Sequence, residues 1–104
     1  MVRAMKRTTT MTVLDNIKAS VPIDIALAHY GITLKVSGNR LTGVCPIHHG
    51  SNKRAFVVSA DRRAWYCFGD CRRGGSVLDL VMTLENCSLS EAGDRLADRY
   101  GVKP

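Results

Sequence analysis

The sequence predicts a small α+β domain, in which an antiparallel sheet of about four to five strands is flanked by N-terminal and C-terminal helices. Three observations predict this fold. Apolar residues recur at helical spacing near both ends of the chain, short alternating segments occupy the middle, and two close pairs of Cys and His residues lie among those segments. A chain of 104 residues has the size of one domain. We expect residues 12–104 to form it and residues 1–11 to be a flexible basic tail.

Helices are predicted on the N-terminal side of the sheet. Val13, Leu14 and Ile17 form an apolar stripe on a first short helix, with Thr12 as its N-cap. A second helix is predicted over residues 20–31, where apolar residues recur at i, i+3, i+4 and i+7. Both helices would place one apolar face against the rest of the domain.

Two more helices are predicted on the C-terminal side. Ser76 and Asp79 form a helix-start pair, and Ser88 with Glu91 forms a capping box that opens a last helix ending at Gly101. The apolar spacing predicts that the inner face of this last helix consists of Leu89, Ala92, Leu96, Ala97 and Tyr100.

Strands are predicted between the two sets of helices. Alternation and β-branched or aromatic content favour strands at residues 32–36, 40–44, 55–59 and 64–66. Turn residues between them predict two antiparallel hairpins. The Arg-Arg-Gly-Gly segment that follows is expected to be a flexible basic exit from the sheet.

Two Cys/His pairs lie on either side of the second hairpin. Two residues separate Cys45 from His48, and three separate Cys67 from Cys71. Pairs at this spacing, joined by a medium loop, are typical of structural Zn²⁺ sites with four protein ligands. We therefore expect one structural Zn²⁺ held by these four residues, with His49 as the alternative imidazole. Buried free cysteines that act as small apolar residues are the alternative to a metal site.

Basic charge concentrates on the metal-binding segment. Residues 40–73 contain seven Lys or Arg against two Asp, whereas residues 74–104 contain three against five acidic residues. A polyanion would be attracted to such a segment, and single-strand binders combine a basic groove with aromatic faces on which bases stack. The residues expected to contact nucleic acid are Lys53, Arg54, Arg62, Arg63, Trp65, Tyr66, Arg72 and Arg73. Strand alternation lets only one of Trp65 and Tyr66 face outward. A basic face that serves only solubility is the alternative for the arginines.

The sequence favours a cytoplasmic protein without a membrane partner. The start of the chain has no apolar stretch of the kind found in secretory signals, and no run approaches the length of a membrane span. Cysteines at metal spacing fit a reducing compartment. The acidic residues are scattered, and four protein ligands would leave Zn²⁺ no open position, so we expect this chain to be non-catalytic by itself.

Taken in order, these motifs resemble one known family. The blocks Cys45-Pro46-Ile47-His48 and Trp65-Tyr66-Cys67-Phe68-Gly69, followed by Gly74-Gly75, are similar to the zinc-binding domain of bacterial and phage DNA primases of the DnaG type. The likeness covers roughly residues 12–102. This chain departs from the family pattern in two places. It has three residues rather than two between its last cysteines, and Lys53-Arg54-Ala55-Phe56 replaces the usual Thr-Pro-Ser-Phe.

The resemblance implies a zinc ribbon that binds single-stranded template DNA and helps to choose where a primer starts. It also implies that such a module works with a separate primase catalytic domain, and with replication proteins such as a helicase or polymerase. Two other interpretations stay open. One is a stand-alone adaptor of a phage or mobile element that binds a replication protein rather than DNA. The other is a redox sensor that releases zinc on oxidation.

Overall fold

The computed structural model describes residues 13–48, 50 and 52–102. The expected basic tail, the Thr12 cap and His49 lie outside the described residues. Residues 13–20 form the first helix, and three further helices follow: Ile23–His29 (α2), Val77–Glu85 (α3) and Leu89–Tyr100 (α4). The strands are Lys35–Ser37 (β1), Arg40–Gly43 (β2), Phe56–Val58 (β3), Trp65–Cys67 (β4) and Gly74–Gly75 (β5).

The five strands form one antiparallel sheet in the order β1-β2-β3-β4-β5, which confirms the predicted fold class. One row of paired residues across the sheet consists of Lys35, Thr42, Val57, Tyr66 and Gly74. The next row consists of Val36, Leu41, Val58, Trp65 and Gly75. Adjacent rows point to opposite faces. Because Leu41, Val58 and Trp65 are buried whereas Tyr66 is exposed, the sheet has a core face and an open face.

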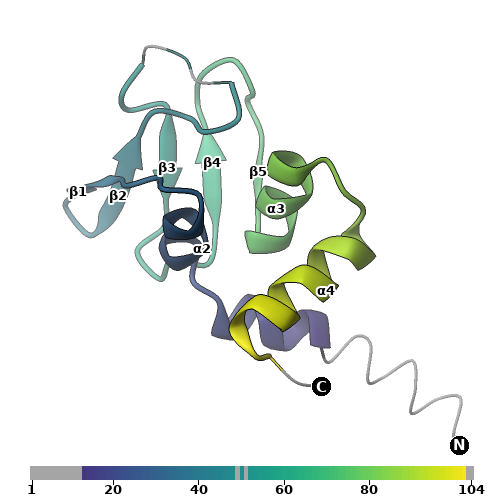
Figure 1. The fold of residues 1–104 in the computed structure, drawn as a ribbon. Coiled ribbons are helices and arrows are strands. Elements are labelled where there is room, and N and C mark those ends of the chain that lie inside the picture. Colours follow the sequence, from purple (N-terminus) through teal and green to yellow (C-terminus); the bar gives the residue numbers. More distant parts are fainter. Residues whose placement is uncertain (1–12, 49, 51, 103–104) are drawn as a thin grey trace, which may run out of the picture.

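The hydrophobic core lies between the core face of the sheet and the helices. Phe56 stacks on Trp65 with ring centroids 5.4 Å apart, and both side chains are buried. Helix α2 contributes Ile23 and Leu27 to the same core, and its amide at Ile23 donates to the carbonyl of Arg62 at 2.8 Å. In Figure 1 the sheet occupies one end of the molecule, while α4 and the first helix lie together at the other end.

The two edges of the sheet differ from the expectation. Residues 32–34 are not a strand, because the amide of Ile32 donates to the carbonyl of Leu27 at 3.1 Å and so belongs to the end of α2. The flexible exit predicted at the Arg-Arg-Gly-Gly segment is wrong, since Gly74 and Gly75 form β5 beside β4. A Cβ at Gly74 would lie 2.2 Å from the carbonyl oxygen of Trp65, so only glycine allows this close pairing.

The helix-start motifs are confirmed. Ser76 and Asp79 form a reciprocal capping box on α3, and Ser88 and Glu91 form one on α4. Gly101 ends α4 in the left-handed conformation, with φ 67°. Within the predicted inner face of α4, Ala92 and Leu96 are fully buried, whereas Leu89 is 44% exposed and that part of the prediction is wrong. Leu89 is the first residue of α4, at the end of the helix that lies at the edge of the core.

A polar network joins α2, α3 and α4. The hydroxyl of Tyr30 donates to Oε2 of Glu85, and Arg95 and Arg99 donate to the same carboxylate at 2.7 Å and 3.2 Å. The hydrogen bond from Tyr30 lowers the pKa of Glu85 to about 2; burial opposes this shift, and the two arginines add to it. Burial, followed by the hydrogen bond to Glu85, raises the pKa of Tyr30 to about 12.

The described part of the chain contains no helix with the length and apolar character of a membrane span.

Candidate metal centre

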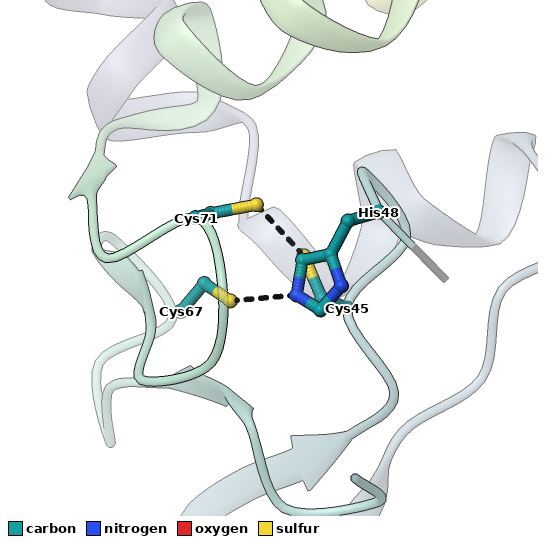
Figure 2. A group of neighbouring side chains, drawn as sticks. All are labelled: Cys45, His48, Cys67 and Cys71. Atoms are coloured by element: carbon teal, nitrogen blue, oxygen red, sulfur yellow. Dashed lines mark hydrogen bonds between the residues drawn. The ribbon is translucent and has the colours of Figure 1, made fainter. Parts of the chain in front are cut away.

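The four predicted metal ligands come together from two turns at the same end of the sheet. Cys45 lies two residues after the end of β2, and His48 lies in the turn after it. Cys67 is the last residue of β4, and Cys71 lies in the turn that leads to β5. Figure 2 shows the three sulfur atoms and the imidazole pointing toward a common centre. Because β2, β3 and β4 are paired, the two turns are neighbours in space although they are distant in the sequence.

The distances among the ligand atoms suit a tetrahedral ion. The Sγ atoms of Cys45 and Cys71 are 3.8 Å apart, and Nε2 of His48 lies 3.2 Å from Sγ of Cys67. All four ligand atoms lie within 4.8 Å of one another. Zn–S bonds of ~2.3 Å place two sulfur ligands of a tetrahedron ~3.8 Å apart. Three sulfurs and one imidazole nitrogen are also the donor set that Zn²⁺ prefers, so the group fits one zinc ion.

Backbone contacts shape the second turn around its extra residue. The amide of Phe68 donates to the carbonyl of Ala55 at 2.7 Å, which ties the turn to the start of β3. Gly69 then passes close to the imidazole, where a Cβ would lie 3.3 Å from Nε2 of His48 and 3.2 Å from Cβ of Ala55. The longer spacing between Cys67 and Cys71 therefore depends on a residue without a side chain at position 69.

The thiols of the cluster differ in their acidity. Burial raises the pKa of Cys67, but hydrogen bonds from His48 and from the backbone at Gly69 and Cys71 outweigh it, and the pKa falls to about 7. Burial and the neighbouring sulfur of Cys45 raise the pKa of Cys71 to about 12. Without a cation, Cys71 therefore holds its proton more tightly than Cys67 does. A bound dication would displace that proton, as metal binding does at cysteine sites.

The imidazole of His48 presents its two nitrogens to different surroundings. Nε2 faces the cysteines, whereas Nδ1 is buried and has no hydrogen-bond partner among the described residues. A Cβ at Gly50 would lie 2.9 Å from Nδ1, so this neighbour also has to be small. Ligand histidines usually donate their second N–H to an oxygen. The ring therefore turns Nε2 toward the cluster, as a ligand through Nε2 would, whereas the usual oxygen partner of Nδ1 is absent among the described residues.

Cys87 lies apart from the cluster. Its Sγ is 3.9 Å from the carbonyl of Val81, in the link between α3 and α4. It packs against the hydrophobic core. Cys87 is therefore not part of the group of four ligand residues.

The basic residues predicted to meet nucleic acid fall into two groups. Lys53, Arg54, Arg63 and Arg72 are exposed around the metal turns and the β3–β4 turn. Arg62 is half-buried and Arg73 is exposed, and both donate hydrogen bonds within the domain. Nη1 of Arg62 donates to the carbonyls of Asn39, Ser59 and Ala60 at 3.0, 3.2 and 2.9 Å. Nη2 of Arg73 donates to Oγ1 of Thr83 at 2.6 Å.

Strand alternation separates the two candidate stacking residues. Trp65 is 3% exposed and its Nε1 donates to the carbonyl of Ser76 at 2.8 Å, so its ring belongs to the core. Tyr66 is 39% exposed on the open face. A base can therefore reach the ring of Tyr66 but not that of Trp65. Burial of Trp65 thus argues against the prediction that it contacts nucleic acid.

Sequence reasoning left out two residues of the open face, Arg40 and Phe68. Phe68 is 64% exposed and lies against Tyr66, with ring centroids 4.6 Å apart. Arg40 begins β2 and is exposed at the same face. The signal that could have found both is alternation, because Phe68 follows Tyr66 by two positions and Arg40 precedes Thr42 by two.

The fold and the site together define a small zinc-ribbon domain, with one structural Zn²⁺ as its cofactor and four protein ligands that leave the metal no open position. Residues 9–104 match the model of the CHC2 zinc finger. The chain belongs to this family, the zinc-binding domains of DnaG-type primases.

Relatives with known names agree with this assignment. The chain is 34% identical over 86 residues to the DNA primase of Streptomyces coelicolor, covering 83% of this chain and 13% of that protein. It is 38% identical over 71 residues to the DNA primase of Clostridium acetobutylicum, covering 68% and 12%. A solved structure of the Aquifex aeolicus primase, with zinc-binding and RNA polymerase domains, matches with a TM-score of 0.76 and 30% identity, covering 88% of this chain and 22% of that one. This chain thus spans about an eighth of the length of those two curated relatives.

Proposed function

We propose that this chain binds single-stranded template DNA and helps to select primer start sites, as the zinc-binding module of a DNA primase or of a primase-like replication protein. Cys45, His48, Cys67 and Cys71 hold the ion, which fixes the two turns that flank the open face of the sheet. The module acts with a primase catalytic domain, and contacts to a helicase or polymerase and a cytoplasmic location remain predictions.

One observation carries the proposal: an exposed aromatic pair lies on the open face beside the metal turns. Tyr66 and Phe68 together offer ring surface to solvent next to exposed cations. Stacking of a base on an aromatic ring contributes ~1–3 kcal/mol in single-strand binders. Adjacent exposed rings form an apolar patch, and such patches favour a binding surface.

The cations around the pair provide the electrostatic part. Lys53, Arg54, Arg63 and Arg72 are exposed and engaged in no side-chain ion pair among the described residues. A single strand that contacts all four would release counterions, and log K would fall with log salt with a slope of about −3.

The test is fluorescence anisotropy of a labelled single-stranded oligonucleotide at several salt concentrations. We expect Tyr66→Ala and Phe68→Ala each to weaken binding ~10-fold, with unchanged zinc content. Lys18→Ala is the control, because this exposed lysine belongs to the first helix, which lies at the end of the molecule away from the sheet (Figure 1). No measurable affinity for the strand, combined with a stable complex with another replication protein, would favour an adaptor instead.

A further inference from the structure

A small hollow lies on the open face of the sheet, between the β1–β2 turn and the β3–β4 turn. Its volume is about 200 Å³. The residues that line it are Arg40, Val57, Ser59, Ala64, Trp65, Tyr66 and Phe68. Pockets for drug-sized molecules have ~300–1,000 Å³, so this hollow has room for about one flat ring system.

We propose that this hollow binds one base of the template strand, and that Arg40 reads that base and favours guanine. This inference rests on the proposed function, because it names the base contact within the same single-strand site. Tyr66 and Phe68 provide an aromatic surface, and Val57 and Ala64 provide apolar contacts beneath it. A base could stack there whatever its identity.

Selectivity must come from the polar groups of the hollow, chiefly from the guanidinium of Arg40. The hydroxyl of Ser59 already donates to Oδ1 of Asp61 at 2.6 Å and accepts from the amide of Ala64 at 3.1 Å. The guanidinium of Arg40 has no hydrogen bond or ion pair with any of the residues that the structure describes. The phenol of Tyr66 adds a single O–H, so Arg40 is the group of the hollow that offers two parallel donors.

A guanidinium fork matches two neighbouring acceptors, and guanine presents such a pair in O6 and N7. Adenine places an amino donor next to N7. Cytosine offers the acceptors N3 and O2, but its single ring covers less of the aromatic pair. Guanine combines the matching edge with the larger stacking surface, so it is the base that this hollow favours.

The position of Arg40 is supported from within the domain. Nη1 of Arg62 donates to the carbonyl of Asn39, the residue before Arg40, and to the carbonyls of Ser59 and Ala60. These bonds tie the two turns on either side of the hollow to each other. The distance between Arg40 and the aromatic pair is thereby held without any ligand.

The experiment compares four short thymidine oligonucleotides that differ only in one central base: guanine, cytosine, adenine or thymine. For the zinc-loaded wild type we expect ~5–50-fold tighter binding of the guanine oligonucleotide than of the all-thymine one. Arg40→Lys keeps the charge and removes the fork, and we expect this preference to fall to less than ~2-fold with little change in affinity for the all-thymine strand. Arg54→Ala, outside the hollow, should weaken all four equally and keep the preference.

Each other result has a definite meaning. Equal binding of all four strands by the wild type would overturn the base pocket but leave the proposed function standing. A preference for another base, or a guanine preference that persists in Arg40→Lys, would also overturn it. A wild type that binds none of the strands would overturn both the pocket and the proposed function.

Discussion

Nε2 of His48 lies 3.2 Å from Sγ of Cys67, although nineteen positions separate the two residues in the sequence. The sheet brings them together, since Cys67 ends β4 and pairs with Phe56 of β3, whose other neighbour is Gly43 of β2, two residues before Cys45. A metal ion at this point would therefore join two turns that strand pairing already holds next to each other.

Replacing a ligand should remove both the metal and much of the stability. We expect Cys67→Ser to reduce zinc content far below one ion per chain and to lower the free energy of unfolding by ~3 kcal/mol or more, because structural zinc contributes ~10–16 kcal/mol in finger peptides. Zinc is measured by elemental analysis and unfolding by urea titration. Cys87→Ser is the matched control and should keep the zinc. A Cys67→Ser protein with full zinc content would show that this residue is not a ligand.

Gly69 should matter for the metal more than for the fold. A methyl group there would meet Nε2 of His48 and Cβ of Ala55 at 3.3 Å and 3.2 Å, so the imidazole has to shift by a few tenths of an ångström. We expect Gly69→Ala to weaken zinc binding ~10-fold in competition with a chelator, an effect of the size seen when the surroundings of ligands are altered.

Gly101→Ala is the comparison for that variant. Its φ of 67° makes any side chain unfavourable, but it lies at the end of α4, away from the cluster. We expect it to cost ~1 kcal/mol of stability and to leave zinc affinity unchanged. Equal zinc affinities of Gly69→Ala and the wild type would show that the second turn adapts without strain.

Arg62 and Arg72 share a left-handed backbone, with φ of 62° and 48°. We expect substitution of Arg62 to lower stability and substitution of Arg72 to weaken DNA binding. Arg62→Ala removes the bonds from Nη1 to three carbonyls and should lower stability by ~1–2 kcal/mol, a modest value because the side chain is partly exposed. Arg72→Ala should change stability by less than ~0.5 kcal/mol and weaken binding of single-stranded DNA ~3–10-fold.

Arg72→Gly sharpens this comparison. Glycine adopts a positive φ without steric cost, so this variant should be at least as stable as the wild type while it binds DNA as weakly as Arg72→Ala. Thermal melting and anisotropy on the same samples measure both quantities. Loss of stability in Arg72→Gly would mean that the arginine has a structural role, and unchanged DNA affinity would mean that it does not contact the strand.

Tyr30 should make stability depend on alkaline pH. Its pKa is raised above the ordinary value of 10.0 to about 12 by burial and by the hydrogen bond to Glu85. The stabilisation is thus complete below about pH 10 and is lost as the pH rises toward 12. Tyr30→Phe should cost ~1 kcal/mol at pH 8, and this difference from the wild type should shrink above pH 10. Urea unfolding of both proteins between pH 8 and pH 11 measures it, and a difference that stays constant up to pH 11 would contradict the assignment.

The fold class, the capping boxes of α3 and α4 and the Cys/His group could be predicted from the sequence because each is a local pattern. A capping box needs residues three positions apart, and a metal pair needs two or three residues between its members. By contrast, the pairing of Gly74 with Tyr66 could not be predicted from the sequence. Two glycines have no side-chain pattern, and they form a strand only where β4 offers a free edge.

The sequence by itself predicted that three cysteines and one of two neighbouring histidines gather around a metal, and that one of two neighbouring aromatic residues faces inward. Only the tertiary structure decided that Trp65 is the buried one and that Arg62 donates hydrogen bonds to backbone carbonyls. It also decided that Arg40 and Phe68 border one hollow with Tyr66. The physical reason is that exposure and hydrogen-bond partners depend on which strands are neighbours and on which face the helices cover, and neither is encoded in the spacing of residues along the chain.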